Sequence, residues 1–331
     1  MKIGIPNTLF AAYHLPYWQE FLGNLGMEVI VSGGSRQENV DAGGKLVPHE
    51  FCLPIKTFLG HVVDLITKNV DLILVPRMIS KGKRNFFCPK LIGLPEIVKY
   101  AANLEDSYFF SPEIICNGLY LEMLKYPRLK TKSGSEFRKA EKQAQRFWEK
   151  ILLKCRKEHL TMAEASSGCG IPPSNRRLRL GLLGYAYALY DPFISKGIIS
   201  KLAGLGAELR TWEMIDPPLI EKKLKKLNRP LVWNFGRILL GAGLYFLEEP
   251  GIDGVVYATS FGCGPDSIVI KLLSLEAGFS QKPFLQLTLD EHSGDGHLKT
   301  RLEAFIDMLT ARKERETAED HISLYGAGAG L

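Results

Sequence analysis

The sequence predicts an α/β protein with two lobes, each built on a parallel sheet that helices cover on both faces. Two observations support this prediction: short apolar strands alternate with helical segments, and the pattern of the first half returns in the second. Such alternation is typical of parallel sheets whose strands are buried on both sides. The length of 331 residues suits one or two domains with sizeable cores.

The repeat consists of a strand, a loop, a helix that begins at a proline, a glycine stop and a second strand. Its helix begins at Pro16 and is stopped by Gly26 in the first half, and begins at Pro192 and is stopped by Gly206 in the second. Proline suits the first turn of a helix, and glycine suits the position just past its end. The second proline-to-glycine distance is four residues greater, since 206 − 192 is 14 and 26 − 16 is 10. We therefore expect the second helix to be about one turn longer.

The remaining elements follow from apolar periodicity and from breaker residues. We expect strands at 2–5, 27–29, 71–75, 179–182, 207–209, 254–258 and 283–289. We expect further helices at 54–68, 95–102, 219–227, 233–247, 266–277 and 298–311.

These elements divide the chain into four parts. The first lobe covers 1–124, a basic helical segment with a linker covers 125–177, the second lobe covers 178–313, and a flexible tail covers 314–331. The linker is placed at 166–177 because serine, glycine and proline are concentrated there. The tail is placed by its alternating glycine and alanine residues.

The positive charge of the chain lies mainly in 125–158. This segment has twelve Lys and Arg against four Glu, a net charge of +8, whereas the whole chain carries +6. Ser133 and Glu136 form a predicted capping box at the start of a helix. One interpretation of this basic segment is a solvated helix docked on a core. The other is a docking face for an acidic partner or an anionic substrate. An apolar stripe follows at spacings of three and four: Phe137, Ala140, Ala144, Trp148, Ile151 and Cys155.

Composition narrows the class of protein. Hydrophobic residues make up 46% and charged residues 24%, which is ordinary for a soluble globular protein. No apolar run approaches the roughly 20 residues that span a bilayer, and the first residues lack a signal-peptide core. We expect a cytoplasmic protein that binds neither membranes nor nucleic acid, with cysteines that are reduced unless they bind something.

Three of the six cysteines follow predicted strands and directly precede helices. They are Cys52, Cys88 and Cys263. Because the carboxyl ends of parallel strands carry the ligand sites of such sheets, we expect these thiols at a cleft between the lobes. A helix N-terminus lowers the pKa of a thiol and favours the thiolate that a metal needs. Gly262 and Gly264 let the backbone approach a bulky ligand closely.

Spacing removes several alternatives for these cysteines. The chain has no Cys-x-x-Cys, no ferredoxin cysteine run, no G-x-x-x-x-G-K-[ST] and no G-x-G-x-x-G after its first strand. Three dispersed thiolates suit one [4Fe–4S] cluster. The plain alternative is that each cysteine is a small buried hydrophobic residue. Cys116 is a further candidate ligand, whereas Cys155 is expected in the core and Cys169 in the linker.

Several motifs together resemble one superfamily. The chain resembles the 2-hydroxyacyl-CoA dehydratase superfamily, in the branch found attached to, or encoded with, the dehydratase activase ATPase. Double-cubane cluster reductases belong to the same superfamily. The motifs that carry the resemblance are Cys52-Leu53-Pro54-Ile55-Lys56, Phe87-Cys88-Pro89-Lys90, Phe261-Gly262-Cys263-Gly264-Pro265-Asp266-Ser267 and Asp290-Glu291-His292-Ser293-Gly294-Asp295.

The resemblance implies two Rossmann-like lobes whose sheets face an interlobe cleft with an iron–sulfur cluster between them. Cys52, Cys88 and Cys263 match the ligand motifs, and Cys116 is a candidate fourth ligand. The cluster expected is [4Fe–4S], with an [8Fe–9S] double-cubane cluster as the alternative.

The resemblance also implies a function and partners. An ATP-dependent activase with its own iron–sulfur cluster would pass low-potential electrons to this chain, which would reduce or dehydrate a small-molecule substrate. A homodimer or heterodimer is expected. The alternatives are a non-catalytic electron carrier, cluster scaffold or accessory subunit, and a metal-free two-lobed binder of small molecules.

Other residues in these motifs have expected supporting roles. Lys56 and Lys90 would offset the negative charge of a cluster, and Gly262, Gly264 and Ser267 would line its site. His292, between Glu291 and Asp295, would shuttle protons to a reduced substrate. The alternative for this loop is a capping network at the start of the following helix.

Overall fold

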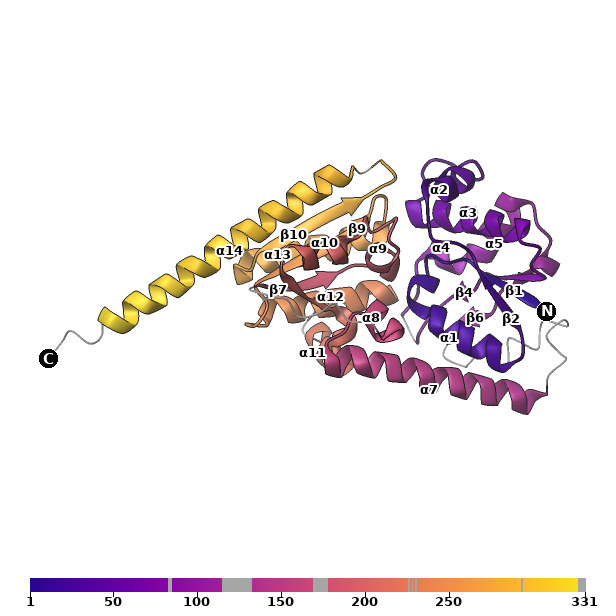
Figure 1. The fold of residues 1–331 in the computed structure, drawn as a ribbon, viewed down its shortest axis with the longest axis horizontal. Coiled ribbons are helices and arrows are strands. Elements are labelled where there is room, and N and C mark those ends of the chain that lie inside the picture. The colour runs from indigo at the N-terminus through magenta and orange to yellow at the C-terminus, as the bar shows by residue number, and fades with distance from the viewer. Residues whose placement is uncertain are drawn as a thin grey trace.

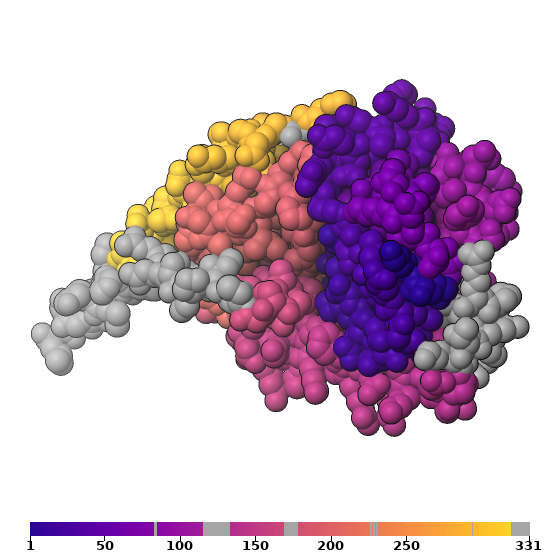
Figure 2. All heavy atoms as spheres, turned by 45° about the vertical axis from the view of Figure 1, so that its right-hand side comes forward, coloured from indigo at the N-terminus to yellow at the C-terminus, as the bar shows by residue number. Residues whose placement is uncertain are grey.

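A computed structural model of the chain describes residues 1–82, 85–114, 133–168, 178–225, 227, 229, 231–292 and 294–326. It has two parallel sheets with helices on both faces, which confirms the α/β prediction. The two lobes lie side by side (Figure 1), and their facing surfaces are in contact (Figure 2).

The first lobe contains a four-stranded parallel sheet in the order β2-β1-β3-β5. A small parallel pair, β4 with β6, extends it. The strands are β1 Lys2–Ile5, β2 Glu28–Val31, β3 Leu72–Leu74, β4 Arg77–Met78, β5 Phe109–Phe110 and β6 Glu113–Ile114. The helices are α1 Ala11–Asn24, α2 Gln37–Gly44, α3 Leu53–Thr67, α4 Pro89–Ile92, α5 Leu94–Ala102 and the short η1 Asp106–Tyr108.

The second lobe contains a four-stranded parallel sheet in the order β10-β9-β7-β8. In each four-stranded sheet, the strand that comes first along the chain lies between the strands that come second and third, and the fourth strand is at the edge. The two halves therefore share one topology. The strands are β7 Leu178–Leu183, β8 Ala207–Thr211, β9 Gly254–Ser260 and β10 Phe284–Leu289. The helices are α9 Ala186–Tyr190, α10 Ile198–Gly204, η3 Trp212–Met214, α11 Pro217–Leu224, α12 Asn234–Glu248, α13 Gly264–Ser280 and α14 Asp295–Gly326.

Strand β9 shows why this sheet is covered on both faces. All seven of its residues are buried. Val255 and Tyr257 pack in one core with α12 and α13, whereas Val256 and Ala258 pack in another with α10 and α14. Successive side chains of a strand point to opposite faces, so a continuous apolar strand needs helices on each side.

Helix α7, Gly134–Glu158, runs along both lobes (Figure 1) and is followed by α8, Met162–Ser167. Ser133 Oγ accepts a hydrogen bond from the Glu136 backbone N–H, which confirms the capping box. All six residues of the predicted apolar stripe, Cys155 included, are buried. The basic residues therefore occupy the outer face of a helix docked on the core.

Two predicted helix starts are wrong. Helix α1 begins at Ala11 and contains Pro16, because Ala11 and Tyr13 are already buried in the core. The second-half counterpart is two short helices, α9 and α10, rather than one longer helix. Between them Asp191 Oδ1 accepts hydrogen bonds from the backbone N–H groups of Phe193 and Ile194, and this side chain replaces the helical bonds there.

The last helix, α14, extends to Gly326 and so continues well beyond the end expected near residue 311. Within the described residues, no helix has the length and apolar content needed to cross a membrane.

Candidate functional site

Cys52, Cys88 and Cys263 line one cavity of about 210 Å³ between the lobes. The first two cysteines belong to the first lobe and the third belongs to the second. The cavity wall is otherwise mostly apolar or aromatic: Leu9, Pro54, Ile55, Pro89, Leu91, Tyr185, Tyr187 and Pro265 complete it, with Lys90, Gly262 and Gly264.

Each of these cysteines is the N-cap residue of a helix. Cys52 precedes α3, Cys88 precedes α4 and Cys263 precedes α13, and each helix has a proline in its first turn. Proline there fixes the backbone direction and removes an N–H that would lack a helical partner. The helix N-termini of both lobes therefore converge on the cavity with their partial positive charge.

A contact between the lobes positions Cys88. Phe86, two residues before it, donates a backbone hydrogen bond to Val232 and accepts one from Asn234, the first residue of α12. Asn234 also donates from its side chain to Asn85. These bonds attach the loop that carries Cys88 to the second lobe.

Burial has a larger effect than the helix N-terminus on the pKa of two of these thiols, Cys52 and Cys263. The pKa of Cys52 is raised by burial, although Lys90 opposes the rise. The pKa of Cys263 is raised by burial and further by the nearby Asp266 carboxylate. The expected lowering of these pKa values is therefore wrong for the protein as it stands, because loss of water costs the thiolate more than the helix dipole returns.

Sequence reasoning missed Asp266. It is buried beside Cys263 and accepts hydrogen bonds from Tyr257 Oη at 2.8 Å and Thr259 Oγ1 at 2.6 Å. Burial raises its pKa to about 7. The sequence contains a pattern that could have identified Asp266, because its two hydrogen-bond donors, Tyr257 and Thr259, belong to the strand that leads to Cys263.

Sequence reasoning also missed Tyr185 and Tyr187, whose rings stack in parallel with centroids 5.5 Å apart. They follow the end of β7, the position at which ligand-contacting residues of such a sheet are found. Tyr185 packs edge-on against Phe235, which in turn packs against Phe87 next to Cys88. These rings exclude water from one side of the cavity.

The two predicted lysines have specific partners. Lys56 Nζ lies 3.0 Å from Glu291 Oε1, so an ion pair joins α3 of the first lobe to the loop after β10. Lys90 Nζ lies 4.8 Å from the centre of the Phe51 ring and lines the cavity. Lys90 is therefore the cation next to the thiols, and Lys56 holds the lobes together one helical turn from Cys52.

The predicted residues of the 290–295 loop have different surroundings in the structure. Glu291 takes part in the cross-lobe ion pair, whereas the His292 side chain is 87% exposed and lies 3.7 Å from Glu291. Asp295 lies in the first turn of α14 and pairs with Lys201 at 2.8 Å. The three residues expected to move protons thus do not meet at one point.

The remaining predicted residues occupy the start of α13. Gly262 has a φ of +75°, which favours glycine, and both Gly262 and Gly264 line the cysteine cavity. Ser267 Oγ donates to the Gly264 carbonyl and is exposed. Cys116 lies outside the described residues.

A single metal ion has no ready site in the described part of the chain. No group of three or more His, Cys, Asp or Glu side chains there is arranged to hold one. The three thiols border a common cavity without converging on a single point.

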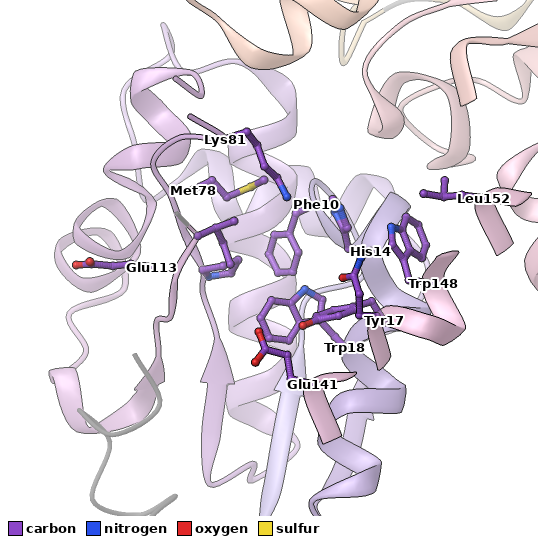
Figure 3. A pocket seen from close by; sticks show the side chains of 13 residues that line it. Phe10, His14, Tyr17, Trp18, Met78, Lys81, Glu113, Glu141, Trp148 and Leu152 are labelled. Carbon is purple, nitrogen blue, oxygen red and sulfur yellow. The ribbon is translucent and has the colours of Figure 1, made fainter. Parts of the chain in front are cut away.

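A larger cavity, of about 460 Å³, lies between the first lobe and α7. Figure 3 shows Phe10, Tyr17, Trp18 and Trp148 around it, with the Lys81 side chain directed toward Phe10 and the Glu113 carboxylate directed away. Burial lowers the pKa of His14 in this wall to about 3, so its imidazole is neutral near pH 7. Its charged lining is of both signs, Lys81 against Glu113 and Glu141.

Comparison with known proteins corrects the expected function. The family described as "CoA enzyme activase uncharacterised domain" matches residues 2–215, which include Cys52 and Cys88 but not Cys263. No curated protein matches the chain. The match links the chain to the activase family of the 2-hydroxyacyl-CoA dehydratase system.

The expectation of an iron–sulfur protein of the dehydratase type, which receives electrons from a separate activase, is therefore wrong. The alternative prediction, a non-catalytic electron carrier, cluster scaffold or accessory subunit of such a system, is wrong with it. No group of side chains in the described residues is arranged to hold a metal ion in its support. The match spans 214 of the 331 residues, and the chain belongs to the CoA enzyme activase uncharacterised domain family.

Proposed function

We propose that this chain acts on the activase side of a CoA-enzyme system of the 2-hydroxyacyl-CoA dehydratase type, and that Cys52, Cys88 and Cys263 form its working site. The family match supports the first half of this proposal, the place of the chain on the activase side. The second half rests on one observation, the three N-cap thiols from two lobes around a common cavity.

The surroundings of the thiols suit a site that works by electron or thiol chemistry. Leu9, Tyr185 and Tyr187 line the cavity with apolar and aromatic surface. Lys90 and the three helix N-termini favour negative charge at the same place. At this partly buried site these positive groups offset part of the cost that burial imposes on an anionic group.

For the group held there, a [4Fe–4S] cluster stays our prediction. Each thiolate of such a cluster binds a different iron, so its ligands stand further apart than the ligands of one ion, which fits thiols spread around a cavity. When bound, the cluster would supply one-electron transfer at low potential. An [8Fe–9S] cluster needs more thiolates than these three.

The proposed partner is a CoA-ester enzyme, a 2-hydroxyacyl-CoA dehydratase, which the chain would help to activate. The finer resemblance, to the branch attached to or encoded with the activase ATPase, supports an activation role.

Activation of such a dehydratase tests the proposal. The chain, prepared without oxygen, would be added with ATP and a reductant to a 2-hydroxyacyl-CoA dehydratase freed of its own activase. We expect dehydration of the 2-hydroxyacyl-CoA to begin with wild-type chain and to fail with Cys263→Ser. Cys155→Ser is the matched control, because that thiol is buried in a different core. A dehydratase that stays inactive with the folded wild-type chain would contradict the proposal.

A further inference from the structure

Helix α13 has a face that no described part of the chain covers. Its inner side chains, such as Val269 and Leu273, are buried against α12 and the second sheet. Its outer face carries four large apolar side chains that are 39% to 82% exposed: Ile268, Leu272, Leu275 and Phe279. Single exposed apolar residues are ordinary, but a row along one helix marks an interaction surface. We call this row the α13 stripe.

The α13 stripe has the spacing of a helix–helix seam. Its members are separated by four, three and four residues. This is the alternation of positions d and a in a heptad repeat, with Ile268 and Leu275 at d and Leu272 and Phe279 at a. A second helix with matching geometry would bury all four side chains.

Charges beside the α13 stripe indicate which helix that is. Lys271 stands at position g on one side, and Glu276 stands at position e on the other. Neither side chain has an ion pair or a side-chain hydrogen bond with any described residue of its own chain. In a parallel pair of identical helices, g of one helix faces e of the other five residues further on. The difference between 271 and 276 is five.

Orientation follows from the same charges. In an antiparallel pair of identical helices, Lys271 would face Lys271 and Glu276 would face Glu276, which is repulsive. In the parallel pair a twofold axis produces two Lys271–Glu276 contacts between the copies.

We propose that the α13 stripe binds the α13 stripe of a second copy of this chain, in parallel, to form a symmetric dimer. This inference does not depend on the proposed function. Its twofold axis runs along α13, so the N-terminal ends of the two helices, each with its Cys263, lie at the same end of the interface. Phe261, which precedes that end in the sequence, is 67% exposed. The two cysteine cavities thereby open toward the same side of the dimer.

Charge exchange tests the orientation. Sedimentation equilibrium of the full chain would measure the dimer dissociation constant for wild type, Lys271→Glu, Glu276→Lys and the double exchange. We expect each single change to weaken the dimer about tenfold, since two attractive contacts become repulsive. The double exchange restores the attraction and hence the wild-type constant. Unchanged constants in the single variants, or no recovery in the double variant, would overturn the parallel pairing.

Two further variants test the surface itself. Leu275→Glu is expected to give monomers with an unchanged circular dichroism spectrum. Leu153→Glu on α7 is the matched control, because Leu153 is 43% exposed and Leu275 is 50% exposed, and it is expected to remain dimeric. Ile268→Cys is expected to form a disulfide-linked dimer on mild oxidation, because each Ile268 faces its own copy. In an antiparallel pair over the same stripe, the two would lie about 16 Å apart, from 11 residues at 1.5 Å each. A wild-type chain that is monomeric at all concentrations, or that self-associates through another surface, would overturn the proposal.

Discussion

Lys56 Nζ bridges both carboxylate oxygens of Glu291, at 3.0 Å and 3.2 Å, and so joins α3 of the first lobe to the loop after β10 of the second. Lys56 is 6% exposed and lies one helical turn after Cys52. Because the ammonium group is largely removed from water, it depends on this carboxylate for compensation. The pair therefore stabilises the approach of the two lobes beside the cysteine cavity.

Removal of this carboxylate is expected to destabilise the protein. Glu291→Gln leaves the Lys56 ammonium buried without its counter-charge, which costs about 1–3 kcal/mol in the free energy of unfolding. Urea denaturation measures the change. Glu303→Gln is the matched control, since Glu303 pairs with Lys299 on an exposed helix face and its loss costs about 0.5 kcal/mol or less. Equal effects of the two variants would contradict a structural role for the Lys56–Glu291 pair.

A second connection between the lobes involves the buried His61. Ser32 Oγ lies 2.8 Å from its Nδ1, and Ser35 Oγ lies 2.9 Å from its Nε2. Ser35 in turn donates to Asp191 of the second lobe, which also accepts from Thr8 Oγ1 at 2.7 Å. Because Ser35 uses its hydrogen for Asp191, its oxygen accepts from His61, so the imidazole carries its proton on Nε2.

This arrangement predicts a loss of stability in acid. Burial lowers the pKa of His61 from its ordinary 6.5 to about 4, so between these values the unfolded chain binds a proton that the folded chain does not. Stability contributed by neutral His61 is complete above pH 6.5 and falls by about 3 kcal/mol as the pH drops to 4. His61→Gln should remove this part of the pH dependence. Urea denaturation of both proteins from pH 4 to pH 7 checks it, and identical pH slopes would contradict the assignment.

Backbone contact between α2 and α3 makes Gly60 irreplaceable. A Cβ at Gly60 would lie 1.9 Å from the Asn39 carbonyl oxygen, and one at Gly43 would lie 1.8 Å from the Lys56 carbonyl oxygen. We expect Gly60→Ala to force the two helices apart and to lower the free energy of unfolding by about 1–3 kcal/mol or more. Gly23→Ala in α1, where a Cβ meets nothing within 4 Å, should instead stabilise the protein by about 0.5–1 kcal/mol. Thermal unfolding followed by circular dichroism distinguishes the two, and a neutral Gly60→Ala would contradict the close approach.

Local chemistry explains why much of the fold was predictable. The buried strand β9 and the capping box at Ser133 follow from residues next to one another in sequence. The placement of Cys52, Cys88 and Cys263 around one cavity between the lobes agrees with the general rule that ligand sites lie beyond the carboxyl ends of parallel strands.

Other features depend on how distant parts of the chain meet. The break between α9 and α10 depends on the side chain of Asp191, which also binds Thr8 in the other lobe. The raised pKa of Cys263 depends on burial beside Asp266. The apolar periodicity of the sequence does not show how much water a side chain loses on folding. The expected meeting of His292 with the site failed for the same reason, since only the packed lobes show that Glu291 turns toward Lys56 while His292 faces solvent.

Iron and acid-labile sulfide in protein purified without oxygen test most directly the claim that Cys52, Cys88 and Cys263 act as one site. We expect about four irons with matching sulfide per chain, lost when any one of the three cysteines is changed to serine and retained in Cys155→Ser. Folded wild-type protein without iron, or iron content equal in all four variants, would contradict it.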